Sequence, residues 1–228
     1  MESSVSRHVL IVSHGQPSEP DVGETEIHDF AKAVAMHLPE WSVSGATLSG
    51  KRTLESKAST MPEGALVYPM FMADGWFTKT VLPERLAAAN LRILQPFGTY
   101  TGLVSIAARA VLEAAPSPTA AVFLAAHGSG KSLRPAEVTR GFAAQLESSL
   151  NMPVHCGFVE QAPYLAEVAR TIKAGAVCLP FFATRRGHVL DDLPNALEEA
   201  RFEGRLLDPV GCLSTTPAFV ADTITMAL

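Results

Sequence analysis

The sequence has few cysteines, no long apolar run and no excess of positive charge. Three cysteines in 228 residues, with no C-x-x-C pair among them, argue against a disulfide framework and a thiolate zinc site. Near the N-terminus, the apolar run from Val9 to Val12 is too short for a signal-peptide core or a membrane span. We therefore expect a cytoplasmic protein that is not anchored in a membrane.

The charge balance is mildly acidic, with 18 Lys and Arg against 23 Asp and Glu and a net charge of -5. Such a chain offers no basic field for a nucleic-acid backbone and no polybasic patch for a membrane surface. Neither partner is expected. The apolar fraction of 47% and the charged fraction of 18% are instead typical of a globular protein with a substantial core.

One sequence pattern occurs twice. A strand-like apolar run ends in a His-Gly pair at His14 and again at His127. The interval between these histidines equals the interval between RILQPFG (residues 92–98) and RLLDPVG (residues 205–211). Matching elements in the same order indicate an internal duplication, and we place its halves at residues 1–115 and 116–228.

Each half alternates short apolar runs with amphipathic stretches, which is typical of βα units around a parallel sheet. The predicted strands are residues 8–13, 42–48, 65–71 and 91–95, and then 119–126, 153–159, 176–182 and 204–208. The predicted helices are residues 26–38, 82–89, 103–114, 136–150, 164–174, 189–201 and 218–228. The predicted fold is α/β: two similar lobes, each a four-stranded parallel sheet flanked by helices, joined by a linker at residues 115–119 and facing each other across a cleft.

Three polar side chains follow predicted strands of the second half. His127, Glu160 and His188 come from successive βα loops, and ligands of such sheets bind at the carboxyl ends of the strands. Two imidazoles and one carboxylate suit a divalent first-row metal and leave coordination positions open. The wide spacing also fits capping or packing roles, so the pattern alone leaves both interpretations open.

The segment HVLDDLP, residues 188–194, resembles the H-x-x-x-D-[IL]-P motif of the class II chelatases, the CbiX and SirB family. Two further segments resemble that family: HGS, which begins at His127, and FVE, which ends at Glu160. The likeness covers essentially the whole chain and is to the long, internally duplicated members. It implies a chelatase-like fold and a metal chelatase, a lyase that works without ATP.

The resemblance also implies a substrate and a site. The expected reaction inserts a divalent metal into a sirohydrochlorin-like tetrapyrrole, in cobalamin or sirohaem biosynthesis. Cobalt is the first expectation, with iron or nickel as alternatives that the same ligands would suit. Carried over residue by residue, the catalytic metal ligands would be His127, Glu160 and His188.

Residues near the third ligand have two interpretations each. Asp192 either orients the imidazole of His188 or is simply a favourable acid in the first turn of a helix. Arg185 and Arg186 either bind substrate carboxylates or are solvated loop charges.

The first half has lost most of the ligand pattern. Alignment of the halves places Phe77 and Ser49 where the second half has its second histidine and its glutamate, so only His14 remains. Trp76 and Phe77 are expected either to line a wall for the flat macrocycle or to fill a core or a subunit interface. His14 is either an additional substrate-binding base or a relic of the duplication.

The same residues also allow other hypotheses about function, which the sequence supports less well. A metal carrier or sensor could use the three ligands without a macrocycle, and a ferrochelatase of the haem pathway would share the fold. VSHGQ, around His14, resembles the RHGQ motif of histidine phosphatases but lacks its arginine. GSGKS, from Gly128, resembles the end of a P-loop, but the first glycine of that motif falls at Ala125. The oligomeric state stays open.

Overall fold

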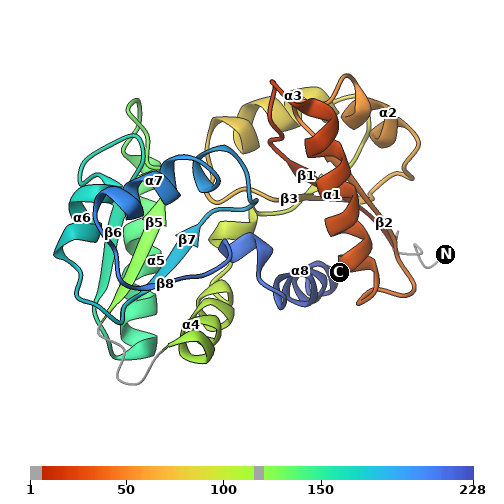
Figure 1. Ribbon diagram of the computed structural model, residues 1–228. Helices are drawn as coiled ribbons and strands as arrows, with labels where there is room; N and C mark the ends of the chain where they lie inside the picture. Colours follow the sequence, from red (N-terminus) through yellow and green to blue (C-terminus); the bar gives the residue numbers. More distant parts are fainter. Residues whose placement is uncertain (1–6, 116–120) are drawn as a thin grey trace. The chain divides into compact units, whose positions relative to one another are not determined.

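The computed structural model describes residues 7–115 and 121–228 of the chain. Apart from Ala115, the predicted linker lies outside the described residues, as does the expected beginning of the strand at residues 119–126. The chain forms two compact units, shown in Figure 1. Unit 1 comprises Met1–Tyr100 and Ser214–Leu228, and unit 2 comprises Thr101–Leu213.

Unit 1 contains a four-stranded, all-parallel sheet in the order β2-β1-β3-β4. Its strands are β1 (His8–Ser13), β2 (Ser42–Thr47), β3 (Leu66–Pro69) and β4 (Arg92–Ile93). Its helical elements are α1 (Pro20–Ala35), α2 (Thr53–Ser59), the π-helical turn η1 (Phe77–Val81), α3 (Leu82–Leu86), η2 (Phe97–Thr99) and α8 (Thr216–Thr225). The continuous apolar sequence of β1 reflects its central position, which buries both of its faces.

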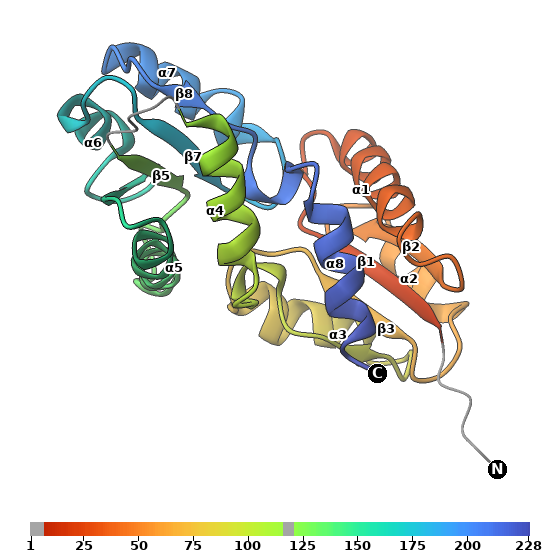
Figure 2. The ribbon, with the colours of Figure 1, turned by 90° about the horizontal axis from the view of Figure 1, so that it is seen from below.

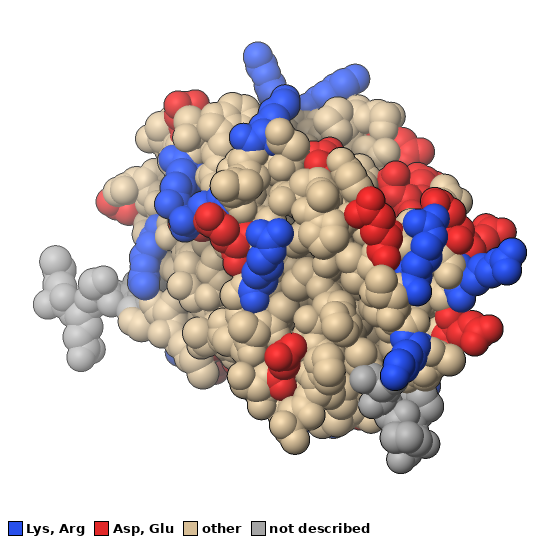
Figure 3. Space-filling model, turned by 90° about the vertical axis from the view of Figure 1, so that its left-hand side faces the viewer, with Lys and Arg blue, Asp and Glu red and all other residues tan. Residues whose placement is uncertain are grey.

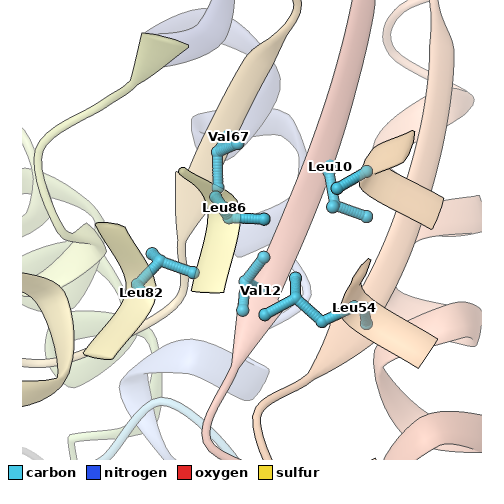
Figure 4. Packing of buried hydrophobic residues seen from close by; sticks show 8 residues of the cluster. Leu10, Val12, Leu54, Val67, Leu82 and Leu86 are labelled. Carbon is cyan, nitrogen blue, oxygen red and sulfur yellow. The ribbon is translucent and has the colours of Figure 1, made fainter. Parts of the chain in front are cut away.

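The core of unit 1 follows the two-residue period of β1. Leu10 and Val12 point to one face of the sheet and pack against α2 and α3, as Figure 4 shows. Other large members of this cluster are Leu54, Val67, Leu82 and Leu86. Each fully buried side chain of this size contributes roughly 1.5–3 kcal/mol. Val9 and Ile11 are equally buried on the opposite face.

Unit 2 repeats this arrangement, with an all-parallel sheet in the order β6-β5-β7-β8. Its strands are β5 (Val122–Ala126), β6 (Val154–Phe158), β7 (Val177–Phe181) and β8 (Arg205–Leu206). Its helical elements are α4 (Leu103–Ala114), α5 (Arg134–Leu150), α6 (Leu165–Thr171), η3 (Gly187–Val189), α7 (Asp192–Glu199) and η4 (Val210–Cys212). The predicted α/β fold with two four-stranded parallel sheets is therefore confirmed.

The last helix of each sequence repeat is counted with the opposite unit. Helix α4 follows the strands of unit 1 but packs beside α5 in unit 2, whereas α8 follows the strands of unit 2 but packs beside α1 (Figure 2). Within unit 1, the Thr223 hydroxyl of α8 donates to the Tyr68 hydroxyl at 3.3 Å. The division at residue 115 thus follows the sequence repeat, while the compact units exchange their final helices.

Several element boundaries differ from the sequence predictions. Helix α1 begins at Pro20 rather than near residue 26, since proline suits the first turn of a helix. Helix α2 was not predicted, and the predicted strands at residues 91–95 and 204–208 are only two residues long in β4 and β8. No helix within the described ranges is long and apolar enough to cross a membrane.

Charged side chains of both signs are interspersed over most of the face drawn in Figure 3. Ion pairs form locally, as between Arg170 and Glu199 of unit 2.

Candidate metal site

The three predicted ligands of unit 2 lie together. His127, Glu160 and His188 each offer a ligand atom, and these atoms all lie within 4.8 Å of one another. The imidazoles of the two histidines are edge to face, with centroids 4.5 Å apart and an interplanar angle of 86°. This spacing allows one cation to contact all three side chains. Among the described residues, no other cluster of this kind is found.

His127 is positioned by the sharp end of β5. The strand stops at Ala126, and Gly128 then adopts a left-handed conformation with φ of 68°. Residues with a side chain rarely adopt such an angle, which explains a glycine directly after the histidine. The turn leaves the His127 side chain 46% exposed at the edge of the sheet.

Glu160 is brought beside His127 by the parallel pairing of β5 and β6. Ala126 pairs with Phe158, and beyond the strands the Glu160 amide donates to the His127 carbonyl at 3.0 Å. The backbone bonding thus continues to the ligands themselves. One carboxylate oxygen of Glu160 lies 3.8 Å from Nδ1 of His127, and the carboxylate remains half-exposed.

His188 lies in the short helical turn η3, between β7 and α7. Its Nδ1 donates to the Asp192 carboxylate at 2.7 Å, one helical turn further along the chain. The turn is closed by the Leu190 and Asp191 amides, which both donate to the Gly187 carbonyl. A carboxylate on Nδ1 holds the proton there and leaves Nε2 with its lone pair.

The same tautomer follows for His127. Its Nδ1 lies 3.1 Å from the Gly128 carbonyl, which can only accept a hydrogen bond. Nδ1 therefore carries the proton, and Nε2 is the atom with a lone pair for a metal. Both imidazoles then offer the same ring nitrogen as a ligand, and two imidazoles with one carboxylate are a set suited to divalent first-row metals.

The two arginines before His188 differ in their surroundings. Arg185 forms an ion pair with Asp208, and both side chains are about half exposed. Arg186 is partly buried. A substrate carboxylate would therefore compete with Asp208 for the Arg185 guanidinium.

The remaining predicted site residues lie in unit 1, at the matching strand end. His14 Nδ1 lies 2.8 Å from the Gly15 carbonyl, and Gly15 has φ of 71°. The ring of Phe77 packs edge-on against His14 with centroids 4.4 Å apart, and Trp76 packs on Phe77 while staying 65% exposed. The Ser49 amide donates to the His14 carbonyl at 3.1 Å, as the corresponding amide does at Glu160.

The cysteines stand apart from the site. Cys178 is fully buried, and burial raises the pKa of its thiol far above the usual range. Burial also raises the pKa of Cys156 to about 11, chiefly by desolvation. Because metals bind the thiolate, these two groups are poor ligands at neutral pH.

Sequence reasoning missed two residues at the site, Gln161 and Asp208. Gln161 follows the candidate ligand Glu160, and its side chain accepts a hydrogen bond from the Ser129 amide at 2.9 Å. Asp208 stands in the repeated RLLDPVG segment, where the first half has Gln95. That charge difference between the halves was the available signal.

Comparison with known proteins agrees with this architecture. The CbiX family model matches residues 121–222. The solved structure of CbiX, the terminal enzyme of sirohaem biosynthesis in denitrifying bacteria, is 42% identical, with a TM-score of 0.87 over 97% of this chain and 100% of that one. SirB from Bacillus subtilis with Fe3+ shares the fold, at 17% identity and a TM-score of 0.72 over 97% of this chain and 96% of that one. A search of curated protein sequences finds no match.

The fold and these matches define the molecule as a class II chelatase. Within that class, the chain belongs to the CbiX family.

Proposed function

We propose that this protein inserts a divalent metal ion into a sirohydrochlorin-like tetrapyrrole without ATP, with His127, Glu160 and His188 as the residues that hold the metal. The observation that carries the proposal is the convergence of three ligand atoms within 4.8 Å at the strand ends of unit 2. The family model matches residues 121–222, a range that contains all three of these residues, which supports placing the chemistry there.

Insertion requires that the metal and two protons exchange places. A macrocycle with two pyrrole N–H groups loses both protons as the dication enters, so the product gains no net charge. Nε2 of His127 and the Glu160 carboxylate are basic groups that can accept these protons as their bonds to the metal are released. Both side chains are about half exposed, which gives a hydrated cation and a large ring access to them.

The ligand set favours delivery over storage. Imidazole and carboxylate bind first-row dications less tightly than thiolates bind borderline metals, so ring nitrogens can displace them one at a time. We expect cobalt to be the first substrate, with iron and nickel as alternatives, since two histidines and one glutamate suit all three. The product would belong to cobalamin or sirohaem biosynthesis.

The residues around the triad have supporting roles in this proposal. Asp192 keeps the proton of His188 on Nδ1, so that Nε2 faces the metal. Arg185 and Arg186 would receive carboxylates of the tetrapyrrole, Arg185 by exchange from Asp208. In unit 1, Trp76 and Phe77 would offer aromatic surface to a macrocycle, and His14 an additional imidazole.

An anaerobic absorbance time course tests the function. Purified protein is mixed with sirohydrochlorin and Co2+, Fe2+ or Ni2+, and each rate is compared with a blank without protein. We expect acceleration above the blank, lost in His188→Ala, and a ranking of the metals. Tight binding of metal without acceleration would contradict insertion and would indicate a carrier.

A further inference from the structure

A side-chain amide joins two of the loops that bear the candidate ligands. Gln161 follows Glu160 in the loop after β6, and Ser129 lies two residues after His127 in the loop after β5. The Ser129 amide donates to Oε1 of Gln161 at 2.9 Å. Beyond the sheet, the two loops are therefore joined by this side-chain hydrogen bond and by the backbone hydrogen bond from Glu160 to His127.

The packing around Gly128 reinforces this link. A Cβ atom at Gly128 would lie 2.8 Å from Cγ of Gln161 and 2.9 Å from Cβ of Phe158. The aliphatic part of Gln161 therefore lies directly against the backbone between His127 and Ser129. Contact and hydrogen bond together fix the Gln161 side chain on the turn that presents His127.

Unit 1 lacks this connection. The position after Ser49 is Gly50, whose amide donates to the Thr47 hydroxyl at 2.9 Å. Gly15 there faces the side chains of Ser49 and Thr47 instead of a glutamine. A cross-loop glutamine is thus found in the unit that has the three candidate ligands and is absent from the unit that has lost two of them.

We propose that Gln161 is a positioning residue that holds His127 and Glu160 at the separation a shared metal requires. The inference rests on the proposed function for the metal site itself. Loops that bear ligands can otherwise drift apart by more than a metal bond tolerates, and groups that orient ligands typically contribute about 10- to 100-fold to metal affinity. Gln161 acts through the loop backbone and need not touch the metal.

Three variants separate positioning from general stability. Gln161→Leu keeps the bulk against Gly128 and removes the acceptor, whereas Gln161→Glu keeps an acceptor oxygen. Gln145→Leu is the matched control, because Gln145 is an exposed glutamine of α5 in the same unit that donates to the Gly141 carbonyl. The measurements are Co2+ affinity by competition titration, hydrogen exchange at the Ser129 amide, and thermal unfolding without metal.

We expect Gln161→Leu to weaken Co2+ binding about 10- to 100-fold and to speed exchange at Ser129, with little change in the unfolding temperature. Gln161→Glu should retain slow exchange and bind Co2+ at least as tightly as the wild type, and Gln145→Leu should match the wild type. Unchanged Co2+ affinity in Gln161→Leu would overturn the positioning role, as would unchanged exchange at Ser129. A wild-type protein that binds no Co2+ would instead overturn the proposed function, so the two failures are distinguishable.

Discussion

The strand ends of the two units are built on the same backbone but carry different chemistry. In both, a histidine precedes a left-handed glycine and lies edge to face with a second ring, at 4.4 Å from Phe77 in unit 1 and at 4.5 Å from His188 in unit 2. The two pairs of rings thus have the same geometry, but the second ring is a phenyl group in unit 1 and an imidazole in unit 2. The comparison indicates that the side chains at positions 77 and 49 are the main difference between the strand end of unit 1 and the candidate metal site of unit 2.

An ion pair joins α2 and α3 of unit 1 and has no counterpart at the matching positions of unit 2. Arg85 binds Glu55 through two nitrogens and also donates to the Leu48 carbonyl, and position 196, which matches Arg85, is alanine. The hydrogen bond from Arg85 lowers the pKa of Glu55. This stabilisation is present above the unfolded-state pKa of the carboxyl and is lost as pH falls through the lowered one. The guanidinium of Arg85 thus ties the loop after β2, through Leu48, to α2 and α3.

The comparison predicts its largest effect at the ligands themselves. Alanine at His127, Glu160 or His188 should each lower the metallation rate by at least about 100-fold, because each change removes a bond to the metal. His14→Ala should lower the rate far less. Initial rates from the absorbance assay check both, and an equal loss at His14 would show that the units do not divide the work in this way.

A smaller effect is expected at Asp192, whose counterpart in unit 1 is Val81. Asp192→Ala should weaken Co2+ binding about 10-fold, because the His188 imidazole loses the partner of its Nδ1. Asp191→Ala is the control, since Asp191 precedes the same helix and makes no side-chain capping bond. Equal losses in titrations of the two variants would assign Asp192 to the helix terminus instead of to His188.

Release of Arg185 should have a modest effect on substrate binding. Asp208→Asn removes the ion pair and leaves the guanidinium free for substrate carboxylates, so the KM for the tetrapyrrole should fall by no more than about 5-fold, the range of exposed ion pairs. Arg185→Ala should raise it. The value of kcat should stay near that of the wild type in both variants. If the KM for the tetrapyrrole is unchanged in both variants, Arg185 does not bind the substrate.

The smallest expected change is in the number of Co2+ ions bound when the missing ligands are introduced into unit 1. The double variant Ser49→Glu with Phe77→His should raise the Co2+ bound per chain from about one to about two, because it restores two imidazoles and a carboxylate at the end of β1. Equilibrium dialysis measures the ratio, with each single variant as its control. A ratio that stays near one would mean that the backbone of unit 1 has diverged too far to hold a metal.

The part of the site that sequence could predict is the part set by the parallel sheet. Strand ends of neighbouring parallel strands meet at one edge, which is why the apolar runs before His127, Glu160 and His188 were sufficient to bring them together. The hydrogen bond between Ser129 and Gln161 could not be predicted. It joins residues 32 apart in the sequence, and it depends on the direction of a side chain in a loop. The pairing of Arg185 with Asp208 also depends on side-chain directions in loops, and the charge difference from Gln95 marks Asp208 without giving its partner.

The fold likewise has parts that the sequence could predict and parts that it could not. The predicted helix at residues 103–114 coincides with α4, whose amphipathic pattern is regular. Helix α2 escaped prediction because it has seven residues and no side-chain cap at its start, and the burial of Leu54 and Ala58 stabilises it instead. The exchange of α4 and α8 between units depends on which core each helix covers, which a linear repeat does not encode.

The proposed function requires the metal to bind in unit 2 at His127, Glu160 and His188 and not beside His14. Anomalous diffraction from crystals grown with Co2+ would locate the ion. We expect one strong cobalt peak, roughly 2.0–2.2 Å from the imidazole nitrogens and the carboxylate of these three residues. A principal peak beside His14, or a cobalt site that avoids Glu160, would contradict it.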